Sequence, residues 1–195
     1  EMATPGNPSE KLRHDKEGVS VDQKQFRSMI GSLLYLSASR PDLLQAVCVV
    51  ARYQSDPKES HLKAIKRIFR YVKGTVHLGL WYGKEGDLKL SGYTDADWAG
   101  DADDRKSTSG GAFLIGDRLV AWQSRKQHCV ALSTTEAEYV AASSMATQII
   151  WMARQLEDMG VTISEATTLH CDNQSAIQIS RNPVQHSRTK HIEIR

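Results

Sequence analysis

Apolar residues recur at three- and four-residue steps through the first third of the chain, and this period predicts helices. One helix is predicted from Asp22, a second from Pro41, since proline suits a first helical turn, and a third from about Ser60 to Gly74. The predicted inward positions are Phe26, Met29, Ile30, Leu33, Leu34 and Leu36, then Leu43, Leu44, Val47, Val50 and Ala51, then Leu62, Ile65, Ile68, Phe69 and Val72. Residues 1–21 have no period and several Pro and Gly residues, which predicts a flexible N-terminal arm.

The third helix carries a basic stripe on its predicted outward side. Its members are Lys63, Lys66, Arg67, Arg70 and Lys73. Such a stripe can follow a phosphate backbone. It can equally be a solvated face whose aliphatic stems lie along the core, and the sequence leaves both interpretations open.

The pattern changes to short β-type runs after Gly74, with a run at residues 76–82 and a turn at 83–87. Alternating apolar residues from Leu88 then predict a strand that ends at Asp95. Further strands are predicted at residues 111–115, 119–123 and 129–132, with a tight Gly116-Asp117 turn joining the first two. Consecutive antiparallel strands make a meander, so we predict a helical domain at residues 22–82 and a second domain at 88–195.

A capping box, Ser133-Thr134-Thr135-Glu136, predicts the start of a long helix that ends at Gly160. Its predicted apolar positions are Ala137, Val140, Ala141, Ile149, Ile150, Met152, Ala153 and Leu156. A strand is predicted at residues 167–171, a short helix at 174–180 and the start of one more helix in the basic run 186–195. The predicted class is therefore α/β, with the order strand, strand, strand, helix, strand, helix.

Composition is that of an ordinary soluble globular protein, with 195 residues, 40% of them hydrophobic and 25% charged. The net charge of +2 does not by itself demand a nucleic-acid partner. Three widely spaced cysteines, Cys48, Cys129 and Cys171, favour an intracellular, reducing compartment. We find no signal peptide and no apolar run near 18 residues, so neither a secretory nor a membrane interpretation has support.

Three acidic residues occupy positions that a fold of this order would bring together. Asp95 ends a predicted strand, Glu138 lies in the second turn of the long helix, and Asp172 ends the next strand. Converging carboxylates repel one another unless cations neutralise them, and oxygen ligands select Mg²⁺ or Mn²⁺. Two such ions can hydrolyse a phosphodiester.

Other interpretations of the acids stay open at this point. Asp172 with Asn173 can form a simple Asx turn at a strand end. Asp97 is expected to cap its own turn, and Glu136 is expected to cap the helix. Glu138 lies outside the capping-box pattern, which makes it the stronger candidate for chemistry.

Five blocks of residues stand out in order along the chain. They are Gly92-Tyr93-Thr94-Asp95-Ala96-Asp97-Trp98-Ala99-Gly100 with Arg105-Lys106-Ser107-Thr108-Ser109-Gly110; Ser133-Thr134-Thr135-Glu136-Ala137-Glu138-Tyr139; Cys171-Asp172-Asn173-Gln174-Ser175-Ala176; Arg188-Thr189-Lys190-His191-Ile192-Glu193; and, upstream, Arg27-Ser28-Met29-Ile30-Gly31-Ser32-Leu33-Leu34-Tyr35 with Arg40-Pro41-Asp42. These blocks resemble the copia-type LTR retrotransposon Pol polyproteins. The second domain is similar to their ribonuclease H domain, and residues 22–82 are similar to the connection region at the end of their reverse transcriptase.

The resemblance implies a ribonuclease H-like mixed sheet, an antiparallel meander plus a parallel strand, flanked by helices. It implies that Asp95, Glu138 and Asp172 hold two Mg²⁺ or Mn²⁺ ions and hydrolyse the RNA strand of RNA–DNA hybrids. The implied partners are the hybrid and the reverse transcriptase and integrase of the same polyprotein, with no membrane and no small-molecule cofactor. The implied location is a cytoplasmic virus-like particle or the nucleus.

The chain departs from the family pattern near its end, and this keeps an alternative function open. The sequence stops before the family's fourth acid and the last strand and helix of the fold, and only Asp97 and Glu193 are nearby substitutes. We therefore expect a piece of a longer polypeptide that is C-terminally truncated. The alternative is a catalytically impaired or domesticated fragment that acts as a nucleic-acid-binding or protein-interaction module.

Overall fold

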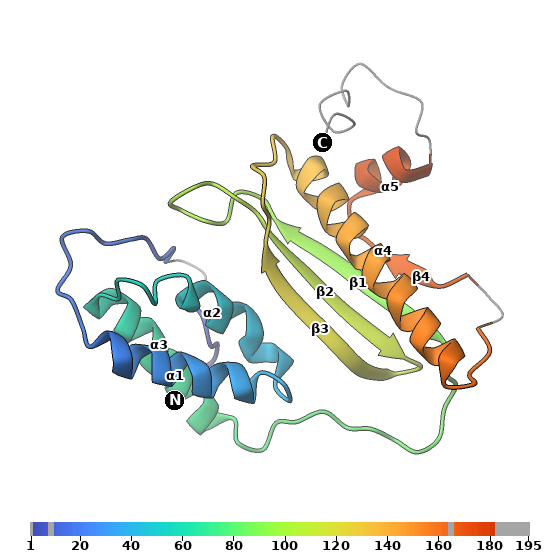
Figure 1. Ribbon diagram of the computed structural model, residues 1–195, viewed down its shortest axis with the longest axis horizontal. Coiled ribbons are helices and arrows are strands. Elements are labelled where there is room, and N and C mark those ends of the chain that lie inside the picture. The colour runs from blue at the N-terminus through green and yellow to red at the C-terminus, as the bar shows by residue number, and fades with distance from the viewer. Residues whose placement is uncertain (1, 8–9, 164–165, 182–195) are drawn as a thin grey trace. The chain divides into compact units, whose positions relative to one another are not determined.

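The computed structural model describes residues 2–7, 10–163 and 166–181 of the chain (Figure 1). The chain divides into two compact units. One contains residues 1–82 together with 100–105, and the other contains residues 83–99 with the chain from Lys106 onward. The sequence-based domain ranges, 22–82 and 88–195, stay predictions.

Three helices make the core of the first unit: α1 (Gln23–Leu36), α2 (Pro41–Ala51) and α3 (Glu59–Gly74). Asp22 caps α1 by accepting a hydrogen bond from the Gln25 amide at 2.9 Å. Each helix buries one stripe against the other two, and the buried residues are Phe26, Ile30, Leu33, Leu43, Val47, Val50, Ile65, Ile68 and Tyr71. The helical period of the sequence predicts this packing because the buried residues recur at three- and four-residue steps.

A buried arginine joins α2 to the end of α3. Arg40 is buried, with 6% of the residue exposed. Its guanidinium donates hydrogen bonds to both carboxylate oxygens of Asp42, at 2.9 and 2.7 Å. It also donates to the carbonyl and hydroxyl oxygens of Thr75, and the Tyr71 hydroxyl donates to Asp42. Arg40 therefore lowers the pKa of the Asp42 carboxyl below its ordinary value, since the paired form is the ionised one.

The segment 100–105 packs within the first unit although it connects two strands of the second. Asp101 is buried, accepts a hydrogen bond from Arg52 at 2.9 Å and also accepts from the amides of Asp103 and Asp104. The Tyr53 hydroxyl, whose ring stacks on His61, lies within hydrogen-bond distance of Asp103. Hydrogen-bonded side chains thus hold this connection on the helices.

The second unit is built on a four-stranded sheet in the order β3-β2-β1-β4. The strands β1 (Leu90–Asp97), β2 (Thr108–Ile115) and β3 (Arg118–Lys126) form an antiparallel meander, and β4 (Thr168–His170) pairs in parallel with β1. Gly116 turns the hairpin between β2 and β3 with φ of +59°, a conformation that favours glycine. The mixed sheet and the element order agree with the sequence-based expectation.

Two helices complete the second unit: α4 (Thr134–Asp158), which packs on β1 and β2, and α5 (Gln174–Arg181), which packs on α4. The core between α4 and the sheet contains Leu90, Phe113, Met145, Ile149 and Met152. Ser133 caps α4 by accepting from the Glu136 amide at 3.1 Å, as the capping box predicts. No helix among the described residues is both long and apolar enough to cross a bilayer.

Two predicted strands are wrong. Residues 76–82 form no strand, and Val76, Leu78 and Trp81 are exposed. Residues 129–132 form none because side chains take their backbone groups. The Trp98 indole donates to the Ala131 carbonyl, and Glu136 accepts from the Leu132 amide.

Some predicted inward positions are also wrong. Phe69 is exposed on α3 because the buried stripe runs through His61, Ile65, Ile68 and Tyr71. Leu34 and Ile150 are exposed as well. The predicted start of a helix at residues 186–195, with Glu193, lies outside the described residues.

Removing the charge of Asp42 is expected to destabilise the helical unit. In Asp42→Asn, the buried Arg40 loses its bidentate partner, which should cost about 1.5–3 kcal/mol of unfolding free energy, the range for hydrogen bonds to charged groups. Because the folded-state pKa of Asp42 is lowered, this stability is present at neutral pH and is lost as the pH falls through that lowered pKa.

Urea unfolding of the full chain at neutral and acidic pH measures the difference. Glu17→Gln, an exposed change of the same charge, is the control and should be within about 0.5 kcal/mol of the unmodified chain. Equal stability of Asp42→Asn and the unmodified chain at neutral pH would contradict the assignment.

Candidate functional site

The parallel pairing of β1 and β4 brings the ends of both strands to the same edge of the sheet. Tyr93 pairs with His170, so Asp95 and Asp172, two residues further along each chain, follow at that edge. Both aspartates are exposed. This is the arrangement that the sequence predicts for two of its three acids.

Two glycines let α4 lie close to the sheet. A Cβ atom on Gly92 of β1 would lie 2.7 Å from Ile149 Cδ1, and one on Gly111 of β2 would lie 2.2 Å from Met145 Sδ. Real side chains do not tolerate such distances. The absence of a side chain at both positions therefore sets the separation between helix and sheet.

This close approach places Glu138 beside β1. Its side chain is nearly buried, with 6% of the residue exposed, and Oε1 accepts a hydrogen bond from the Ala96 amide at 3.2 Å. Ala96 directly follows Asp95. The helix acid is thus fixed next to the strand acid by a backbone hydrogen bond.

The pKa of the Glu138 carboxyl depends on its burial and on the two neighbouring aspartates. Burial raises the pKa of the Glu138 carboxyl above its ordinary value, and the hydrogen bond from Ala96 opposes this. The negative charges of Asp95 and Asp172 raise the pKa further. Each acid therefore destabilises the ionised form of Glu138, and a cation at this edge would relieve that repulsion.

Cys171 is a fourth group at the same edge. Ligand atoms of Glu138, Cys171 and Asp172 all lie within 4.8 Å of one another, and the Cys171 Sγ lies 4.0 Å from Glu138 Oε2. Asp95 lies outside this compact trio. Burial raises the pKa of the Cys171 thiol above its ordinary value, a backbone hydrogen bond from Asn173 lowers it, and the nearby acids raise it further. The other two members of the trio, Glu138 and Asp172, offer carboxylate oxygens. Such a set fits a hard divalent cation.

The two neighbouring acids bond backbone amides, although the amide that Asp97 bonds belongs to the neighbouring strand and not to its own turn. Asp97 accepts a hydrogen bond from the Thr108 amide across the β1–β2 pair. Glu136 is buried and accepts from the Leu132 amide at 2.6 Å, one residue before the N-cap. One oxygen of each carboxylate is thus taken by a backbone amide.

Comparisons with known proteins place the chain in a family. It is 46% identical over 181 residues to the Retrovirus-related Pol polyprotein from transposon TNT 1-94 of Nicotiana tabacum, covering 92% of this chain. It is 39% identical over 193 residues to the polyprotein from transposon RE1 of Arabidopsis thaliana, covering 99% of this chain. The chain spans 14% and 13% of the length of these two polyproteins.

The chain belongs to the copia-type retrotransposon Pol polyproteins. A further relative is Secreted RxLR effector protein 161 of Plasmopara viticola, 44% identical over 128 residues, which are 65% of this copia-type chain and 90% of that protein. No family model matches the chain. No solved structure matches it either.

Sequence reasoning missed two rings beside the acids of this copia-type chain. Tyr93 and His170 stack with their centroids 4.7 Å apart and their planes at 20°. Each ring lies two residues before an acid, so it shares that acid's side of the sheet. The rings meet because Tyr93 pairs with His170 in the β1–β4 register, which the sequence alone does not give.

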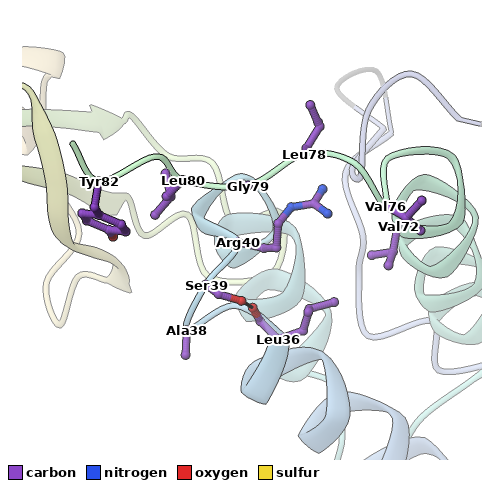
Figure 2. Close-up of a pocket in the computed structure, with 10 residues that line it drawn as sticks. All are labelled: Leu36, Ala38, Ser39, Arg40, Val72, Val76, Leu78, Gly79, Leu80 and Tyr82. Carbon is purple, nitrogen blue, oxygen red and sulfur yellow. Dashed lines mark hydrogen bonds between the residues drawn. The ribbon is translucent and has the colours of Figure 1, made fainter. Parts of the chain in front are cut away.

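A cavity of the helical unit, shown in Figure 2, carries no comparable chemistry. It measures about 480 Å³ and is lined by the α1–α2 turn, Val72 of α3 and the segment 76–82. Arg40 is the charged residue in its lining, and the guanidinium is already bonded to Asp42 and Thr75. We therefore place the candidate site at the edge formed by β1 and β4.

The glycine that admits α4 is expected to be sensitive to one added methyl group. Gly111→Ala forces Met145 out of its place, which should cost about 1–3 kcal/mol of unfolding free energy. Gly110→Ala, on the opposite side of the same strand, meets its nearest atom at 3.7 Å and should change stability by less than about 1 kcal/mol. Urea unfolding of both variants measures the contrast, and equal effects would refute the close-approach interpretation.

Proposed function

We propose that this chain hydrolyses the RNA strand of RNA–DNA hybrids, with the second unit acting as a ribonuclease H-like domain. The observation that carries the proposal is the position of Glu138, which bonds the amide next to Asp95 and has a carboxylate oxygen within 4.8 Å of a carboxylate oxygen of Asp172. The element order and the mixed sheet support it, since the resembling family has the same order. The similarity to Pol polyproteins supports it independently.

Asp95, Glu138 and Asp172 would hold the divalent cations, Mg²⁺ or Mn²⁺. When bound, such ions activate water and stabilise the leaving oxygen of a phosphodiester. Glu138 is held in place by the Ala96 amide, so its carboxylate enters the site with little freedom. Asp95 and Asp172 are exposed and can therefore face a bound strand. In the proposed reaction, water oxygen bonds to phosphorus, the bond to the 3′ oxygen breaks, and that oxygen takes a proton.

The polyprotein relatives suggest the setting of this activity. These relatives are Pol polyproteins of transposons, so we propose that the chain works beside the other parts of such a polyprotein, including reverse transcriptase and integrase. The helical first unit contributes no acid to the proposed site. Its proposed role is to support the hybrid.

A second function has specific support and is the alternative. A protein described as a secreted effector is 44% identical to part of this chain, which indicates that segments of this family occur outside polyproteins. Asp95 also lies outside the compact trio of Glu138, Cys171 and Asp172. A non-catalytic nucleic-acid-binding or protein-interaction module fits both observations.

A cleavage assay distinguishes the two functions. The full chain is incubated with an end-labelled RNA–DNA hybrid in Mg²⁺ or Mn²⁺, and RNA cleavage is expected with loss of activity in EDTA. Asp95→Asn and Glu138→Gln should each lower the rate by more than the roughly 10–100-fold that loss of an outer-shell partner costs.

Asp117→Asn, an exposed change of the same charge in the β2–β3 turn, is the matched control and should keep the rate. Binding of the hybrid without metal-dependent cleavage by the folded chain would reject the nuclease and favour the alternative. Cleavage that survives both site variants would also reject it.

A further inference from the structure

The exposed face of α3 presents four cations in one row. Lys63, Lys66, Arg70 and Lys73 are all exposed. At 100° per residue they fall within a sector of about 80°, and at 1.5 Å per residue the row is about 15 Å long. We call these four residues the α3 cation row.

The core fixes which way this row points. Ile65, Ile68 and Tyr71 are buried against α1 and α2, so the helix cannot rotate about its axis without exposing them. Arg67 belongs to the basic stripe in the sequence, but its side chain bonds Thr4. Its guanidinium donates to the carbonyl and hydroxyl oxygens of Thr4 at 3.2 and 2.9 Å, and we leave it out of the row.

The row has no acidic partner among the described residues. None of its four members forms an ion pair there, whereas the buried cations Arg40 and Lys58 pair with Asp42 and Asp56. Glu59, one turn before Lys63, is the acid in the first turn of α3. Like charges three and four residues apart destabilise a helix by a few tenths of a kcal/mol per pair, so an external anion would stabilise this face.

We infer that the α3 cation row binds the phosphate backbone of a nucleic acid strand. Phosphates on one strand recur about every 3.4 Å along a duplex axis, so a row about 15 Å long faces about four of them. Lysine and arginine side chains of this kind make contacts that are independent of base sequence. The row lies in the helical unit and uses none of Asp95, Glu138 and Asp172, so it is tested separately from the nuclease site.

The test is a salt titration of binding. Fluorescence anisotropy of the full chain with a labelled RNA–DNA hybrid is recorded in EDTA over a series of NaCl concentrations. Lys66→Gln with Arg70→Gln removes two contacts, which should reduce the slope of log K against log[salt] by about 1.4–1.8. The charge-preserving pair Lys66→Arg with Arg70→Lys should keep the slope.

Lys16→Gln with Lys24→Gln removes the same charge from exposed positions of the same unit and should leave the slope unchanged. Equal losses in both double variants, no loss in either, or no hybrid binding by the unmodified chain would each overturn the proposal. Selective loss of binding to anionic phospholipid vesicles, with hybrid binding intact, would overturn it in favour of a membrane surface. Because EDTA prevents metal-dependent cleavage, row-dependent binding by a chain that fails the cleavage assay counts against the nuclease alone.

Discussion

The close packing of α4 on β1 and β2 is the constraint on which the candidate site depends. Gly92 and Gly111 leave no room for a side chain beneath Ile149 and Met145, so helix and sheet have one separation. At that separation Glu138 accepts a hydrogen bond from the Ala96 amide. The negative charges of Asp95 and Asp172 then raise the pKa of the Glu138 carboxyl. A helix held further away would leave Glu138 without its amide donor and the strand acids without a third partner.

The two units differ in where their charged residues lie. The second unit gathers negative charge at one edge of a sheet, where burial and mutual repulsion raise the pKa of Glu138. The first unit packs three helices around an apolar core and pairs its buried charge internally through Arg40 and Asp42. Among the described residues, the four members of the α3 cation row form no ion pair.

Much of this was accessible from the sequence because periodicity reports burial. Ile65 and Ile68 follow the helical period and are buried, and the capping box begins α4 where it predicts. The pattern of apolar residues fails to predict structure where side chains from neighbouring segments bond the backbone. Residues 129–132 are apolar enough for a strand, yet Trp98 and Glu136 take their backbone groups. The proximity of Cys171 to Glu138 and the stacking of Tyr93 on His170 depend on the β1–β4 register, which single residues do not encode.

We propose that Asp95, Glu138 and Asp172 share divalent cations, and the positions of bound metal ions are the direct test of this proposal. Crystals of the chain grown with an RNA–DNA hybrid and Mn²⁺, measured at a wavelength where manganese scatters anomalously, reveal where the ions bind. Manganese peaks are expected within about 2.5 Å of oxygens from all three carboxylates, with Cys171 sulfur outside the coordination sphere. Manganese bound elsewhere, or held by Glu138, Cys171 and Asp172 without Asp95, would refute the proposed three-acid site.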